Sequence, residues 1–235
     1  MSNKPYQSFG NPDIALARQN TFVVRVYGWM TLGLVITALA SFYTLTQQGL
    51  LAAVFSNPLL LWGLLIGEVA LVVVISAGIN RLSPAVASAL FMFYAALNGL
   101  TLSFILLIYS VSSVAQTFLI TAGTFGVMSA YGYLTKRDLT SLGNLLLMAL
   151  LGFLLASVVN IFVGSTAIYW VTTFLGIIIF VGLVAYDTQK IKQMSTLTTE
   201  GTDANKNGAI LGALRLYLDF VNLFLLLLRL FGRRR

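Results

Sequence analysis

Two aspartates lie inside runs of apolar residues that are long enough to cross a lipid bilayer. Asp187 occurs in IIIFVGLVAYDTQ, and Asp219 occurs in LGALRLYLDFVNLFLLLL. A carboxylate within hydrocarbon costs roughly 2.5–3.5 kcal/mol on insertion scales, so such residues are functional by default. The chain has only seven acidic residues, and two of them stand in its last two hydrophobic segments. This aspartate pair is therefore the first candidate for a functional site.

The chain contains no histidine and no cysteine. No imidazole can act as base, zinc ligand or proton sensor, so a pH response near neutrality must come from carboxylates. Two carboxylates in contact at low dielectric share a proton and titrate as a coupled pair. Once deprotonated, Asp187 and Asp219 offer oxygen ligands of the kind that Ca²⁺ prefers, together with backbone carbonyls, waters and an amide such as Asn222.

Three other ionisable residues bear on this interpretation. Arg215 precedes Asp219 by four residues and could neutralise it along one helix, which is the structural alternative to a proton switch. In another structural alternative, Asp187 lies close enough to the interface to contact water. Arg81 is either a latch that pairs with the aspartates or an anchor of topology. Glu68, in LLIGEVALVV, is either a second acid on an ion pathway or a locally satisfied residue.

The composition predicts an all-α, polytopic membrane protein. The chain is 58% hydrophobic and 9% charged, whereas a soluble domain is about 25% charged. A run of about 20 apolar residues spans the roughly 30 Å hydrocarbon core. We expect a polar N-terminal tail at 1–21, a single seven-helix domain at 22–235, and a long, mobile loop at 194–208. The predicted helices cover 22–45, 58–79, 84–108, 112–134, 141–163, 167–190 and 209–230.

Basic residues cluster on one side of the predicted helices. Positive charge in short loops marks the cytoplasmic side, so we predict a cytoplasmic N-terminus. The net charge of +7 then reflects topology and gives no reason to expect nucleic-acid binding. Seven crossings place arginines 233–235 outside, against the rule; a re-entrant segment is the alternative, and we favour seven crossings. The nine basic residues of the predicted cytoplasmic side are Lys4, Arg18, Arg25, Arg81, Lys136, Arg137, Lys190, Lys192 and Lys206.

Small residues recur at four-residue spacing in two of the predicted helices. They are Ala122, Gly126 and Ala130 in one helix, and Gly208 and Gly212 in another. In lipid such spacing lets helix backbones approach closely. We therefore expect tight helix contacts at both places.

Several motifs around these residues carry a resemblance to a known family. They are VAYDTQ (184–189), LYLDFVNLF (216–224), VYGWM (26–30), GLTL (99–102), YGY (131–133) and KRDL (136–139). Together they resemble the Bax-inhibitor family of multi-pass membrane proteins, and in particular its bacterial inner-membrane branch. The resemblance implies seven helices with the last one central, and a pH-sensitive Ca²⁺ leak gated by Asp187 and Asp219. Arg215 departs from the family pattern, in which an uncharged residue is common, and so challenges the shared-proton switch.

Three functions remain in view. The leading one is a proton-regulated cation leak in the bilayer, with Ca²⁺ as the transported ion, no cofactor and no enzymatic activity. The second is a regulatory protein that binds or inhibits another membrane protein, such as a protease. The third is an intramembrane aspartyl protease, which pairs a Tyr-Asp helix with a Gly-x-Gly-Asp helix. Residues 216–219 contain no glycine, and the Pro-Ala-Leu motif of those enzymes is absent because the only prolines are 5, 12, 58 and 84.

Overall fold

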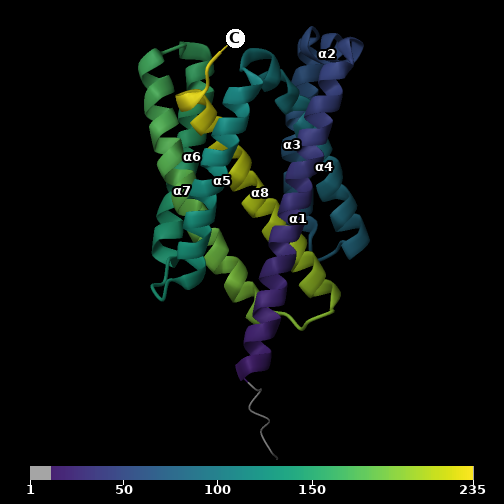
Figure 1. The fold of residues 1–235 in the computed structure, drawn as a ribbon, viewed down its shortest axis with the longest axis vertical. Coiled ribbons are helices and arrows are strands. Elements are labelled where there is room, and N and C mark those ends of the chain that lie inside the picture. The colour runs from purple at the N-terminus through teal and green to yellow at the C-terminus, as the bar shows by residue number, and fades with distance from the viewer. Residues whose placement is uncertain (1–11, 235) are drawn as a thin grey trace, which may run out of the picture.

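The computed structural model describes residues 12–234 and is built of helices (Figure 1). Seven helices within this range are long and apolar enough to cross a membrane, as predicted, and one further helix, α2, is short. The elements are α1 (Pro12–Thr46), α2 (Gln48–Phe55), α3 (Pro58–Gly78), α4 (Pro84–Ile108), α5 (Val111–Leu134), α6 (Thr140–Val163), α7 (Thr166–Leu197) and α8 (Asp203–Phe231).

Local sequence explains where most of the helices begin. Pro58 and Pro84 occupy the first turns of α3 and α4, where proline removes no intrahelical hydrogen bond. Polar side chains cap five of the helices by accepting a backbone N–H of the first turn, which satisfies one of the free donors there. These caps are Asn57, Ser83, Ser110, Ser165 and Thr202.

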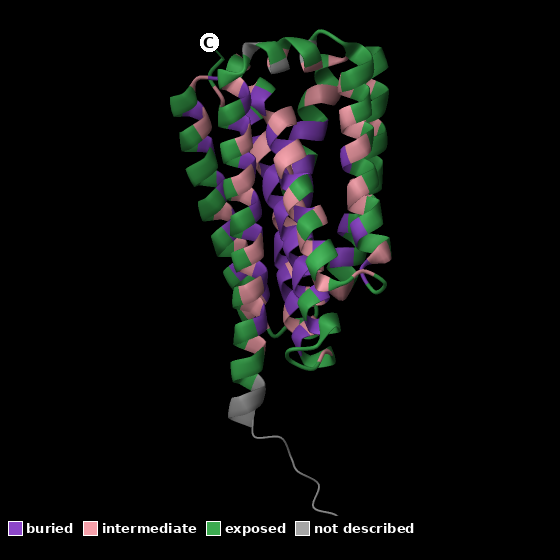
Figure 2. Cartoon of the chain, turned by 90° about the vertical axis from the view of Figure 1, so that its right-hand side faces the viewer, coloured by how far each residue is buried: buried purple, intermediate pink, exposed green. Residues whose placement is uncertain are grey.

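Helix α8 lies at the centre of the bundle (Figure 1). It packs against α1, α3, α4, α5 and α7, whereas α6 packs against α7 on the outside. In an 18-residue apolar stretch of each helix, 67% of the residues are buried in α8 but only 6% in α6. Figure 2 shows the same pattern, with buried residues inside and exposed ones on the outer helix surfaces. The central position of the last helix is thus confirmed, with α6 one layer further out.

Tyr217 of α8 is the largest fully buried side chain of this core. Its ring packs edge-to-face on Phe91 and Tyr94, with ring centroids 5.8 and 5.7 Å apart. Such aromatic pairs add about 0.5–1.5 kcal/mol beyond area burial. In lipid, where helices gain little from leaving the hydrocarbon, close packing of this kind holds a bundle together.

Several helix ends differ from the predicted ones. Helix α1 begins at Pro12, within the expected polar tail, and α7 and α8 extend well into the polar segment 194–208. Only residues 198–202 remain between α7 and α8, so the expectation of a long loop was wrong. The apolar pattern marks where a helix leaves hydrocarbon, but the backbone continues in helical form because its hydrogen bonds are internal.

The two ends of the described chain lie on opposite faces of the bundle (Figure 1). Seven candidate spans among residues 12–234, an odd number, agree with this arrangement. We call the end where α1 begins the N-terminal face and the other end the C-terminal face. At the C-terminal face Ser110 donates its N–H to the Arg233 carbonyl, and the Arg233 N–H donates to Ser113 Oγ at 2.9 Å. The last residues are therefore tied to the start of α5.

Candidate functional site

The structure brings Asp187 of α7 and Asp219 of α8 together. Their carboxyl groups are close enough to interact with each other, between two helices that pack closely. Asp219 is 5% exposed, and the side chain of Asp187 is 13% exposed. Asp219 Oδ2 has no hydrogen-bond partner among the described residues. Two carboxyl groups that share a buried site disfavour each other's ionisation, because like charges repel strongly at low dielectric.

Two glycines place Asp187 by letting neighbouring helices approach α7. A Cβ on Gly132 of α5 would overlap the Ala185 carbonyl, and one on Gly143 of α6 would overlap the ring of Tyr186. The next turn is fixed by Gln189, whose Oε1 accepts the Leu139 N–H at 2.9 Å and whose Nε2 donates to a carbonyl of the same loop at 2.8 Å. The α5–α6 loop and two glycines therefore set the position of α7 beside the aspartate.

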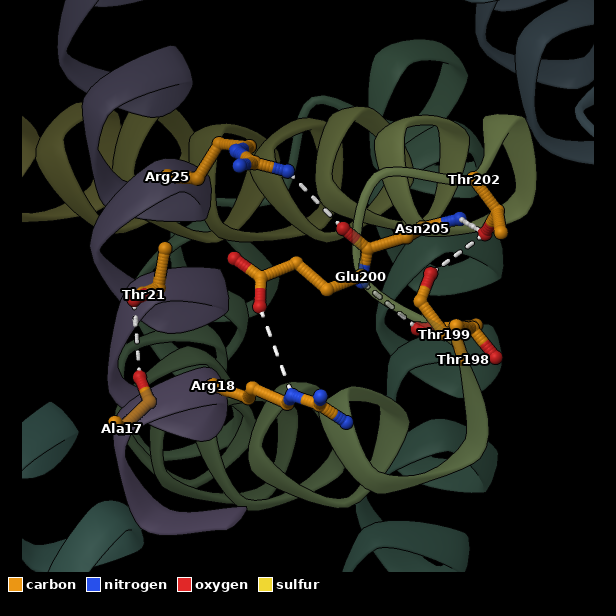
Figure 3. Close-up of polar contacts among 9 residues, drawn as sticks. All are labelled: Ala17, Arg18, Thr21, Arg25, Thr198, Thr199, Glu200, Thr202 and Asn205. Carbon is orange, nitrogen blue, oxygen red and sulfur yellow. Dashed lines mark hydrogen bonds and ion pairs between the residues drawn. The ribbon is translucent and has the colours of Figure 1, made fainter. Parts of the chain in front are cut away.

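A clasp at the N-terminal face holds α1 against the α7–α8 turn (Figure 3). Arg25 Nη1 donates to Asn205 Oδ1 at 3.0 Å, and Arg18 lies 3.8 Å from the Glu200 carboxylate. Sequence reasoning treated these arginines only as topology charges. Their partners are 180 residues or more away along the chain, and nothing in the sequence marks such a pairing.

Arg215 pairs across helices and not along its own. Its Nη1 lies 3.9 Å from Asp187 Oδ1, and 45% of its side chain is exposed. The i, i+4 partner considered from the sequence, Asp219, is reached only at longer range. Because exposed ion pairs contribute roughly 0–1 kcal/mol, Arg215 balances the charge of the aspartate pair without strongly anchoring it.

The protonation state of the aspartate pair sets the net charge of this site. With one shared proton the aspartate pair carries one negative charge, and Arg215 carries one positive charge, so the group is neutral in low dielectric. Loss of the shared proton leaves two adjacent carboxylates and a net negative charge. Hydrocarbon penalises that state unless a cation replaces the proton.

Glu68 lies in a separate buried network between α3, α4, α8 and α1. Its carboxylate accepts hydrogen bonds from Thr101 Oγ1 at 2.5 Å and Asn98 Nδ2 at 3.3 Å. The Tyr217 hydroxyl donates to Asn98 Oδ1 at 3.1 Å and lies 2.6 Å from Thr37 Oγ1. Both alternatives for Glu68 stay open. Its hydrogen-bond partners satisfy the carboxylate locally, and the residue is also an acid buried deep in the bundle, as an ion pathway would need.

Two further predicted residues do not join the aspartate pair. Arg81 lies exposed after α3 and forms no ion pair with any acid in residues 12–234. Asn222 donates its amide to the Leu218 carbonyl of its own helix at 2.8 Å. Within the described chain, no three acidic side chains gather into a metal-binding group. A cation at Asp187 and Asp219 would therefore take its other oxygen ligands from the backbone and from water.

A model of the family described as "Inhibitor of apoptosis-promoting Bax1" matches residues 19–235. The chain belongs to this Bax-inhibitor family. The match covers all seven candidate spans except the first residues of α1 and includes both aspartates. The family resemblance inferred from the motifs is thereby confirmed.

Relatives in several bacteria cover almost the whole chain. Inner membrane protein YbhL of Escherichia coli (strain K12) is 52% identical over 216 residues, which are 92% of each chain. A protein of Borreliella burgdorferi is 43% identical over 92% of this chain and 94% of its own length. The membrane protein SpyM3_0260 of Streptococcus pyogenes is 38% identical over 91% and 93%. The seven apolar spans and the name of the Escherichia coli relative support a multi-pass protein of the inner membrane.

Proposed function

We propose that this Bax-inhibitor family protein is a pH-sensitive cation leak, with Ca²⁺ as the transported ion. The observation that carries the proposal is the contact between the carboxyl groups of Asp187 and Asp219 in the interior of the bundle. Both protons and Ca²⁺ compete for such a pair, because a carboxylate must be deprotonated before it can ligate a metal ion. Release of the proton then gives the neutral site a net negative charge, which attracts cations.

The rest of the site fits this exchange. Asp219 Oδ2 is buried and unpartnered among the described residues, so it is free to face an ion. Arg215 is half-exposed and lies at Asp187, where its positive charge favours release of the proton from the pair. Deprotonation also sets two like charges against each other across the α7–α8 contact, which favours separation of the two helices. We infer that helix separation opens the path for the ion.

Calcium flux through the purified protein tests the proposal. In liposomes loaded with a Ca²⁺ indicator, the wild type should pass Ca²⁺ at a rate that depends on pH. The Asp187→Asn and Asp219→Asn variants should lose that pH dependence, because an amide cannot share or release the proton.

Asp138→Asn is the matched control. Asp138 lies in the α5–α6 loop, where hydrogen bonds from the Thr140 hydroxyl and N–H lower the pKa of its carboxyl. It is therefore already ionised near neutrality, and its replacement should leave the pH profile unchanged. Pure protein that passes no Ca²⁺ at any pH would instead favour the regulatory-partner function, and an unchanged profile in both aspartate variants would overturn the proton switch.

A further inference from the structure

A groove runs along the outside of the bundle between α1 and α5, with α8 as its floor. A first hollow in this groove has a volume of about 240 Å³, and its lining includes Ala38 of α1, Phe118 of α5, and Phe220 and Phe224 of α8. A second hollow shares Ala38, Phe118 and Phe220 with the first, and a third shares Tyr27 with the second. The three hollows therefore form one continuous groove.

The small residues of α5 face this groove. Ala122, Gly126 and Ala130 were expected to pack closely on another helix, but all three are exposed. No neighbouring atom lies within 4 Å of a Cβ built on Gly126, and the residues line the second and third hollows. The small side chains widen the groove, so the expectation of a tight helix contact on α5 was wrong.

A transmembrane helix is too wide to occupy the whole groove. The Tyr133 hydroxyl donates to Asn20 Oδ1 at 2.5 Å, which joins α5 to α1 at the N-terminal face. An α-helix with its side chains is about 10–12 Å across, and this bond leaves no such space between the two helices. A hydrocarbon chain is narrower and is the surrounding solvent of both helices.

One polar group in the groove has no partner. Ser129 is 7% exposed, lines the third hollow, and its Oγ forms no hydrogen bond within the described chain. Such a hydroxyl is costly to leave unpaired. Ser129 lies eleven residues from Phe118 along α5, or about 16 Å of helical rise. That distance matches half of the roughly 30 Å hydrocarbon core, which is the depth that one acyl chain reaches.

Basic residues lie beside or follow the end of α5 that is nearest Ser129. Lys192 Nζ donates to the Tyr133 carbonyl at 2.9 Å and lies 4.9 Å from the centre of the Tyr133 ring. Lys136 and Arg137 follow α5 directly and are exposed, and Asp138 is the single acid of that loop. Basic residues at the membrane surface attract anionic headgroups by about 1 kcal/mol each.

We propose that the α1–α5 groove binds one anionic phospholipid. Its headgroup lies by Lys136, Arg137 and Lys192, an ester carbonyl accepts the hydroxyl of Ser129, and an acyl chain extends over Phe220 to the hollow beside Phe118. The lipid thus covers the side of α8 that the other helices leave open.

Native mass spectrometry of the full chain in mild detergent tests this site. Dioleoyl phosphatidylglycerol and dioleoyl phosphatidylcholine are the probes. We expect the wild type to retain one phosphatidylglycerol, and the Ala122→Trp and Ala38→Trp variants, which fill the groove, to retain at least tenfold less. Ala89→Trp, the same change at an exposed position of α4, should retain as much as the wild type.

Two gentler changes keep the test decisive if tryptophan disturbs the fold. Ser129→Ala removes a hydroxyl that has no partner among the described residues, so it should leave folding intact and weaken lipid retention roughly two- to tenfold. Lys136→Gln with Arg137→Gln should abolish the preference for phosphatidylglycerol over phosphatidylcholine. Equal retention of phosphatidylglycerol by all variants would overturn the proposed lipid site. So would the finding that a second copy of the chain, or a helix of another protein, occupies the groove in place of lipid. Neither outcome bears on Ca²⁺ flux.

Discussion

At the scale of single residues, the candidate site depends on the charge balance around Asp187 and Asp219. Arg215 is the only basic side chain that forms an ion pair with the aspartates in the described structure. It lies on the exposed side of the pair and meets Asp187, while Asp219 faces the interior. One aspartate therefore has a permanent countercharge, and the other has none. This asymmetry makes Arg215 a tuner of the proton equilibrium.

Replacing Arg215 with glutamine should shift the pH profile of Ca²⁺ flux to higher pH. The positive charge favours the ionised pair, so its removal lets the pair hold its proton to a higher pH. Because the side chain is 45% exposed, the shift should be only roughly 0.5 pH unit. Liposome flux measured in small pH steps gives the midpoint. Arg229→Gln, on the same helix but over the Tyr169 ring, is the control and should not move it.

At the scale of elements, the site depends on how closely α5 and α6 approach α7. Gly132 lies directly against the backbone of Ala185, two residues before Asp187. Gly123, on the same helix, would carry a methyl group with no neighbouring atom within 4 Å. Two glycines of one helix thus have opposite roles, one at a backbone contact and one in open space.

Gly132→Ala should destabilise the protein by about 1–3 kcal/mol, the usual cost of forcing extra atoms into a packed contact. It should also alter the pH profile of flux, because α7 must move to make room. Gly123→Ala should leave both properties unchanged or raise stability slightly, since alanine favours the helix. Thermal unfolding in micelles and liposome flux measure the two effects. Equal stability of both variants would contradict the close contact at Ala185.

At the scale of the whole molecule, an odd number of spans separates the two ends. The connections at the N-terminal face contain Arg81, Lys136 and Arg137, whereas Arg233 and Arg234 end the described chain at the other face. The positive-inside rule counts the lysines and arginines in short loops near the ends of the spans. The N-terminal face has more of these basic residues than the C-terminal face. The C-terminal arginines oppose the rule but are few and tied down by hydrogen bonds at Ser110 and Ser113.

Reporters fused to the two ends should therefore report opposite compartments. We expect a cytoplasmic signal, such as green fluorescence, from the N-terminal fusion. The C-terminal fusion should be active only with a reporter that works outside the cytoplasm, such as alkaline phosphatase. Activity of the same reporter at both ends would require an even number of crossings and would contradict the seven-span topology.

Much of the fold followed from apolar run length and helix-start signals, because a bilayer sets both the length and the hydrogen bonding of its spans. The choice of Asp187 and Asp219 as the candidate pair came from the cost of charge in hydrocarbon, and the structure places the two residues together on α7 and α8. The partner of Arg215 could not be predicted in this way. Sequence spacing identifies neighbours along one helix, but it does not show which side of that helix faces the next one. The prediction for the small residues of α5 was wrong for a related reason. Small residues at four-residue spacing can face either a neighbouring helix or an open groove, and the sequence does not distinguish the two.

The central helix has one further consequence. Tyr217 and Asp219 are two residues apart on α8, so they project about 200° apart around its axis. Asp219 contacts Asp187 of α7, while the Tyr217 hydroxyl meets Thr37 of α1 and Asn98 of α4. A turn of α8 that parts the carboxyl groups therefore also pulls on these two bonds at the opposite side. The network of Glu68 would therefore resist any rotation of α8 that separates the two carboxyl groups.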